Sequence, residues 1–174
     1  MPVVELLQAH HDRKSFDCGK SPLNDFLQKQ ARQNAERNVG VTYIVVPEPG
    51  SPHILGYYTV VTRTIESAVV PENKKLPCGS LGVVLLGRLA VDKNAQGQRL
   101  GKRMLLRAVR QTEQAAREIG IFALVPNALD EEARAWYLGL GFGFEVLLDD
   151  PNHLFLPVGV IRQLGLSETP APAL

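Results

Sequence analysis

The chain has 174 residues, which is enough for one domain with a hydrophobic core. Its formal net charge is +1, so overall charge indicates no particular partner, and any contact with nucleic acid requires a local basic patch. No run of about 18 apolar residues is present, which argues against a membrane-spanning helix, and we expect no secretory signal. Cys18 and Cys78 lack the spacing of metal ligands. We therefore expect a cytoplasmic protein whose thiols are reduced.

The first half of the chain predicts strands around one helix. Residues 2–8 are expected to form a short strand, and a helix follows with Ser21 as its N-cap. Residues 41–48 and 53–67 are rich in β-branched and aromatic residues, and we expect them to pair as a hairpin. Residues 69–80 are rich in turn residues and are expected to form a loop.

The second half alternates apolar strands with helices. Residues 83–92 predict a buried strand, and residues 98–118 predict a long amphipathic helix whose apolar side continues to Ile119. A short strand over 119–126 and a helix over 129–142 follow. The segments FEVLL and HLFLPV are expected to form a closing hairpin.

This order of elements predicts an α/β (α+β) fold in which helices flank a mixed central sheet. Residues 1–166 are expected to form a single domain. Residues 167–174, SETPAPAL, are polar and rich in proline and alanine, and we expect this tail to be disordered.

Two glycines and several cations lie where the strand at 83–92 leads into the long helix. The start of a helix leaves backbone N–H groups unpaired, and these donors together with the helix dipole favour a phosphate. Gly97 and Gly101 permit close approach of a ligand to the backbone, and Arg99 and Lys102 would add positive charge. An ordinary strand-to-helix turn explains the glycine spacing about equally well.

The segment LLGRLAVDKNAQGQRLGKRML resembles the acetyl-CoA-binding segment of the GNAT acetyltransferase superfamily. Gln96 takes the first position of the Q/R-x-x-G-x-G/A loop and Gly101 the last, while Arg99 stands where an inner glycine is usual. The resemblance implies a GNAT fold with acetyl-CoA as acetyl donor, and we expect no metal. It further implies that the backbone of Leu89 and Val91 pairs with the pantetheine arm and that the loop holds the pyrophosphate. The expected cofactor-binding residues are Leu89, Ala90, Val91, Gln96, Gly97, Gln98, Arg99, Leu100, Gly101, Lys102, Asp130 and Ala133.

The segment EEARAWYLGLGF resembles a second GNAT signature, A-x-x-(F/W)-Y-x-x-x-G-F. Five positions match: Ala133, Trp136, Tyr137, Gly141 and Phe142. Asp130 stands where many members have asparagine. By resemblance, Tyr137 lies near the thioester sulfur and protonates the leaving thiolate. A phenol suits this role because its pKa near 10 keeps it protonated at neutral pH. The alternative is that the aromatic pair only packs the helix.

The segments FDCGKSPLNDFLQKQARQN and VTYIVV resemble the N-terminal part of GNAT-type toxins from bacterial toxin–antitoxin operons. The matching positions are Phe16, Cys18, Gly19, Leu23, Asn24, Phe26, Leu27, Ala31, Thr42 and Tyr43. This resemblance implies a toxin that acetylates the α-amino group of aminoacyl-tRNA and so blocks translation. It also implies a ribbon–helix–helix antitoxin as partner and a homodimer.

An aminoacyl-tRNA acceptor places a smaller demand on the active site than lysine does. An α-amino group has a pKa of about 7.7–8.0, so much of it is already the free amine at neutral pH. Neither GNAT-like motif contains a candidate base, and the four histidines are expected to be solvated or structural. We therefore expect an acid-only mechanism, with Tyr137 as general acid and backbone N–H groups around Leu89 polarising the thioester carbonyl.

Recognition of tRNA also needs a basic surface. The candidate RNA-binding residues are Lys29, Arg32, Arg37, Lys74, Lys75, Lys93 and Arg103. Any one of them is also expected on an ordinary solvated face. Two other functions are open: N-acetylation of a protein or small-molecule amine, and a CoA-binding module without turnover.

Overall fold

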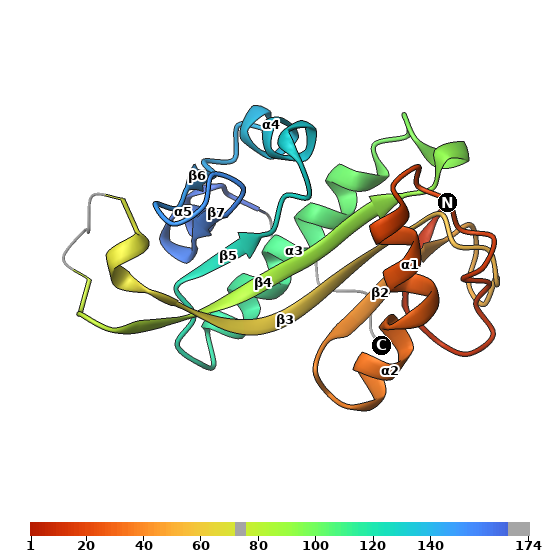
Figure 1. The fold of residues 1–174 in the computed structure, drawn as a ribbon, viewed down its shortest axis with the longest axis horizontal. Helices are drawn as coiled ribbons and strands as arrows, with labels where there is room; N and C mark the ends of the chain where they lie inside the picture. Colours follow the sequence, from red (N-terminus) through yellow and green to blue (C-terminus); the bar gives the residue numbers. More distant parts are fainter. Residues whose placement is uncertain (72–75, 167–174) are drawn as a thin grey trace.

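A seven-stranded sheet forms the centre of the protein, in the order β1-β2-β3-β4-β5-β7-β6 (Figure 1). The structure is a computed structural model that describes residues 1–71 and 76–166, so the predicted tail lies outside the described residues. Neighbouring strands are antiparallel except β4 and β5, which run parallel. The strands are β1 (Val3–Leu6), β2 (Val41–Val46), β3 (Gly56–Glu66), β4 (Ser80–Val91), β5 (Ala123–Pro126), β6 (Glu145–Val146) and β7 (Leu154–Pro157).

Helices cover both faces of the sheet (Figure 1). They are α1 (Ser21–Lys29), α2 (Ala31–Glu36), α3 (Leu100–Ala116), α4 (Glu131–Gly139) and α5 (Val158–Gln163), with short 3-10 turns at Ser67–Val69 and Lys93–Ala95. Because side chains alternate along a strand, Tyr57 and Tyr58 of β3 point to opposite faces. Tyr58 belongs to the core under α3, whereas Tyr57 belongs to the core under α1. No helix in the described ranges is long and apolar enough to span a membrane.

The predicted order of strands and helices is confirmed with local corrections, the first being that the single helix expected after β1 is divided at Gln30 into α1 and α2. Ser21 is the first helical residue rather than the N-cap; Lys20 holds that position, without a side-chain hydrogen bond. The long helix ends at Ala116, so Ile119 is 58% exposed instead of continuing the apolar face. Helix α5, which directly follows Pro157, was not expected.

A β-bulge interrupts the pairing of β3 with β4. Thr59 pairs with Arg88 and Val60 with Leu86, so Gly87 is the extra residue. A Cβ atom at Gly87 would lie 3.1 Å from Oγ1 of Thr59, which explains why glycine suits this position. Bulges bend a strand and increase its twist, and this one lies where β4 begins to separate from β5.

Candidate active site

The cleft begins where two parallel strands part. Pairing of β4 with β5 ends at Leu86 and Pro126, but β4 continues to Val91. From Arg88 to Val91, β4 pairs with β3 on one side, and among the described residues no strand pairs with its other side. A strand edge of this kind offers backbone N–H and C=O groups to an extended ligand, as the sequence analysis expects for pantetheine.

The loop after β4 contains two residues with left-handed backbone just before helix α3. Gly97 has a φ of +84° and Arg99 a φ of +61°, so both are left-handed. Arg99 is also the N-cap of α3, which makes it a non-glycine residue in a conformation that favours glycine. Successive N–H groups in such a turn, together with the start of a helix, form a concave site for negative charge.

Gly101, the second residue of α3, lines the cleft. A Cβ atom there would make only ordinary contacts, the nearest 3.5 Å from Trp136. Nothing in the described protein therefore demands glycine at this position, and the missing side chain leaves the backbone open to close approach of a ligand. This observation fits a pyrophosphate bound at the start of α3.

The loop and the strand edge border one cleft of about 1160 Å³. Every predicted cofactor-binding residue except Asp130 lines it. Eight further residues that were not expected from the sequence also line the cleft: Cys18, Lys20, Leu23, Ala95, Leu106, Glu132, Trp136 and Leu140. Arg103, a candidate RNA-binding residue, lines it as well.

Residues 16–24, here called the N-terminal wall, are fastened to the cofactor side of this cleft. The side chain of Asn24 accepts a hydrogen bond from the Cys18 N–H (2.9 Å) and donates one to Asp17 (3.0 Å). The Asp17 N–H donates to the buried carboxylate of Asp92 at the end of β4 (3.0 Å). An ion pair between Lys93 and Asp17 (2.7 Å) holds the pKa of that carboxyl at about 2. Part of the toxin-like signature is therefore a wall of the cleft, which its residues Cys18 and Leu23 line.

Gln96 joins three parts of the site through one amide group. Its Nε2 donates to the carbonyl of Val91 (3.1 Å) and to that of Cys18 (3.4 Å). The first position of the GNAT-like loop motif thus closes the loop onto β4 and onto the N-terminal wall. The sequence could indicate the motif, but not these partners.

Tyr137, the predicted general acid, lies on α4 but does not itself line the cleft; it shares one helical face with two residues that do. It is four residues after Ala133 and three before Leu140, and such spacings share one side of a helix. Its ring packs edge-on against Trp136 and Phe144, at centroid distances of 5.0 and 5.5 Å. The side chain is buried, and burial raises its pKa above the usual value of a phenol. No hydrogen-bond partner of its hydroxyl is present among the described residues.

Asp130 has another role in this structure than contact with the cleft. Its carboxylate caps α4 by accepting a hydrogen bond from the Ala133 N–H (2.9 Å), and it also pairs with Lys20 (2.9 Å). These two contacts, the cap first, lower the pKa of Asp130. The Lys20 ion pair connects the N-terminal wall with α4.

The candidate RNA-binding residues do not gather in one patch. Three of them pair with surface carboxylates: Lys29 with Asp25, Arg32 with Glu36, and Lys93 with Asp17. Arg37 is exposed at the C-terminal end of α2, and Arg103 donates to the Pro2 carbonyl (3.4 Å). Lys74 and Lys75 lie outside the described residues. Among the described candidates, the structure thus brings Arg103 to the cleft and Lys93 to the N-terminal wall, and leaves Lys29 on α1 and Arg32 and Arg37 on α2 and its C-cap.

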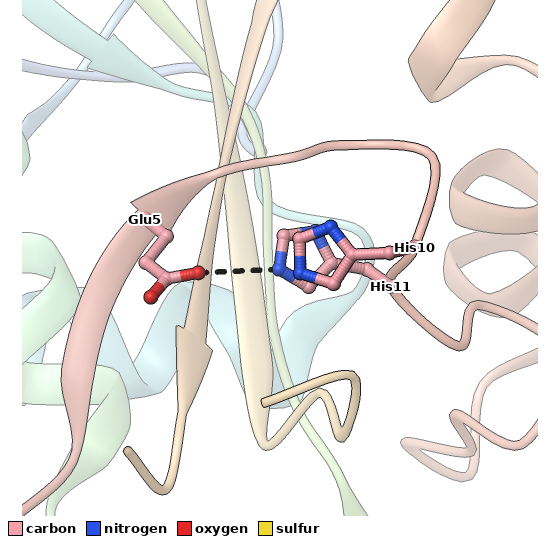
Figure 2. A group of neighbouring side chains, drawn as sticks. All are labelled: Glu5, His10 and His11. Carbon is pink, nitrogen blue, oxygen red and sulfur yellow. Dashed lines mark hydrogen bonds and ion pairs between the residues drawn. The ribbon is translucent and has the colours of Figure 1, made fainter. Parts of the chain in front are cut away.

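Glu5, His10 and His11 form a group whose ligand atoms are close enough to suggest a metal site (Figure 2). The Gln8 N–H donates to Nδ1 of His11 (2.9 Å), so the proton of the neutral ring is on Nε2, facing Glu5 at 3.2 Å. A metal on Nε2 would need that nitrogen deprotonated, which conflicts with the bond at Nδ1. Burial lowers the pKa of His11 and favours this neutral form. The group is therefore a structural contact between β1 and the following loop.

The split between β4 and β5, the glycine loop at a helix start and a tyrosine on the next helix together define an acetyltransferase-type site. Residues 43–143 match the acetyltransferase (GNAT) domain, and the chain belongs to this family.

Similar proteins carry further information about this branch of the family. A "tRNA-acetylating toxin" of Mycobacterium tuberculosis H37Rv is 36% identical over 155 residues, which cover 88% of this chain and 90% of that protein. A structure of the toxin AtaT with acetyl-methionyl-tRNAfMet aligns with a TM-score of 0.86 and 32% identity over 94% of this chain and 99% of that one. A tyrosine-to-phenylalanine variant of AtaT, bound to the C-terminus of the antitoxin AtaR and to acetyl-CoA, aligns with a TM-score of 0.79 and 30% identity, over 94% and 97% of the two chains.

Proposed function

We propose that this protein is a toxin that transfers acetyl from acetyl-CoA to the α-amino group of an aminoacyl-tRNA and thereby blocks translation. The observation that carries the proposal is the 36% identity with a tRNA-acetylating toxin across 88% of the chain. The AtaT complex with an acetylated aminoacyl-tRNA supports the same acceptor class.

On the donor side, the residues present fit acetyl-CoA. The loop from Gln96 to Lys102 would hold the pyrophosphate through backbone N–H groups, with Lys102 adding positive charge. The free edge of β4 around Leu89 would hold the pantetheine arm, and its N–H groups would polarise the thioester carbonyl. Acetyl-CoA supplies an activated acyl group whose leaving group is a thiolate.

Tyr137 is the proposed general acid. Burial raises its pKa, so the hydroxyl stays protonated throughout the neutral range. Its hydroxyl has no partner among the described residues, which leaves the proton available for a developing thiolate. An α-amino group needs little help to lose its own proton because its pKa is about 7.7–8.0. Tyr137 can therefore complete the reaction without a dedicated base.

The proposed partners follow from the same relatives. The AtaT variant is bound to the C-terminus of an antitoxin, which supports an antitoxin as neutralising partner here. We further propose that this partner is a ribbon–helix–helix protein, that the toxin forms a homodimer, and that it acts in the cytoplasm. Arg103 and Lys93 are the proposed RNA contacts nearest the site.

The experiment that tests this function uses the purified protein with labelled acetyl-CoA and a panel of acceptors. The panel contains individual charged tRNAs, the same tRNAs uncharged, free lysine-containing peptides and polyamines. We expect label only in charged tRNAs, released with the amino acid when the ester is hydrolysed. Labelling of peptides or polyamines in preference to charged tRNA would contradict the proposed acceptor.

A further inference from the structure

Arg88 is a cation on β4 without a charged partner. It lies beside the bulge at Gly87, and its guanidinium carbon is 3.6 Å from the centroid of the Phe26 ring on α1. No carboxylate and no hydrogen-bond acceptor pairs with it within residues 1–71 and 76–166. Partial burial lowers the pKa of its guanidinium, and the opposing electrostatic effect of Tyr57 is smaller than this effect of lost hydration.

The unpaired nitrogen atoms of Arg88 remain accessible. Among described residues that are not exposed, the only side-chain nitrogen or oxygen that is both fully buried and unpaired belongs to Arg134. Arg88 therefore has its guanidinium over the Phe26 ring, while its N–H groups still reach solvent. A guanidinium held in this way is oriented before a ligand arrives, and it presents a fork of donors that matches a phosphate.

Arg88 also lies next to the wall of the cleft. Its side chain is on the α1 side of β4, in contact with Phe26. Burial raises the pKa of the Tyr57 phenol; Arg88 is close enough to oppose this rise, whereas Cys18, from the same core cluster as Tyr57, adds to it. The Tyr57 hydroxyl donates to the carbonyl of Leu23 (2.6 Å), and both Leu23 and Cys18 line the cleft. The backbone of Arg88 precedes Leu89, whose surroundings are the proposed thioester site. The guanidinium is thus on the side of β4 that faces the N-terminal wall.

We propose that Arg88 binds a phosphodiester of the RNA acceptor, close to the aminoacyl group that is acetylated. This inference rests on the function proposed above. The carboxyl group of the amino acid in an aminoacyl-tRNA is esterified, so the phosphodiesters of the 3′-terminal nucleotides supply the nearest negative charge. A single cation fixed on an aromatic ring would place the ester end of the RNA at the thioester site.

The test compares two acceptors that differ in phosphate. One is an aminoacyl-adenosine, which has no phosphate, and the other is the matching aminoacyl-CCA trinucleotide, with the amino acid chosen from the tRNA panel. Initial rates are measured for the wild type, Arg88→Met and Arg88→Lys, together with the control variant Arg63→Met. Arg63 is an exposed arginine of β3, without an ion pair in the described part of the chain.

For Arg88→Met, we expect KM for the trinucleotide to rise about 10- to 100-fold, the range for one hydrogen-bonded charge, with kcat within about twofold. Its KM for aminoacyl-adenosine should stay within about twofold of the wild type. The slope of log KM for the trinucleotide against log salt should fall by roughly 0.7, the value for one single-strand phosphate. Arg88→Lys should recover part of the loss, and Arg63→Met should behave as the wild type.

Acetyl-CoA affinity and the melting temperature of each variant separate binding from folding. Equal changes of Arg88→Met on both acceptors, or no change on either, would overturn the role of Arg88 and leave the proposed function standing. A wild type that acetylates neither acceptor nor any charged tRNA would overturn the proposed function, and this inference with it.

Discussion

Replacing Arg99 with glycine tests whether the backbone or the side chain of this residue serves the cofactor loop. Arg99 has a φ of +61°, and its exposed side chain makes no ion pair within the described residues. A left-handed conformation costs a non-glycine residue about 1–2 kcal/mol. Glycine removes this cost but gives the unfolded chain additional entropy, worth about 0.4–1 kcal/mol. We expect Arg99→Gly to raise the free energy of unfolding by about 0.5–1 kcal/mol.

Arg99→Ala is the matched control because it removes the side chain and keeps the strain. Its free energy of unfolding should stay within about 0.5 kcal/mol of the wild type, as is usual for surface changes. The difference in free energy of unfolding between Arg99→Gly and Arg99→Ala corresponds to a melting temperature about 1–4 °C higher for the glycine variant in a chain of this size. Differential scanning calorimetry without ligand measures both variants.

Isothermal titration with acetyl-CoA completes the test. Because the left-handed turn directs backbone N–H groups at the ligand, we expect both variants to bind acetyl-CoA within about threefold of the wild type. A loss of about tenfold in both would show that the guanidinium itself holds the phosphates. A glycine variant that melts below the alanine variant would refute the strain argument.

Three further predictions concern other residues of the structure. Tyr137→Phe should lower kcat about 10²- to 10⁴-fold, the usual range for a general acid. Its acetyl-CoA affinity and stability should not change, because the lost hydroxyl has no partner in the described protein. Full activity of this variant in steady-state assays would rule out Tyr137 as the acid. Asp130→Ala should lower the free energy of unfolding by about 0.5–2 kcal/mol because the α4 cap is lost. Asp130→Asn keeps the cap and should lower it by less than about 0.5 kcal/mol, as measured by urea unfolding. Equal losses in the two variants would assign the stability to the ion pair with Lys20 instead. The pKa of His11 is lowered in the folded state, so the unfolded chain takes up its proton first, and stability should be full above about pH 6.5 and decline as the pH falls below it. His11→Gln should remove that part of the decline in pH-dependent unfolding, and an unchanged pH profile would show that other groups cause it.

Local patterns were sufficient to predict the parts of the site that local chemistry forms. The glycines after the apolar strand predicted the loop at the start of α3, and the structure places Gly97 in a left-handed turn there. The helix expected over 129–142 forms as α4, and Asp130 caps it. Gln96 and Gly101 of the first GNAT-like motif line one cleft together with Ala133 and Trp136 of the second, because one strand, one loop and two helices position them.

Contacts between distant segments could not be predicted in the same way. Gln96 reaches Cys18 across 78 positions, and Lys20 reaches Asp130 across 110. Such partners depend on how the chain packs, which no local period encodes. The bulge at Gly87 could not be predicted for the same reason, because the register of β3 against β4 depends on both strands together. Helix α5 was missed because six residues after a proline are too few to show a helical period.

The parting of β4 from β5 has a consequence for the behaviour of the protein in solution. From Arg88 to Val91, β4 is an inner strand by position but has a ladder on one side only in the described protein. Half-paired strands of this kind recruit other strands and promote aggregation. A ligand that occupies the gap both covers this edge and stabilises the folded state by mass action. The supply of acetyl-CoA in a cell would then govern how long the folded protein persists, in addition to how fast it works.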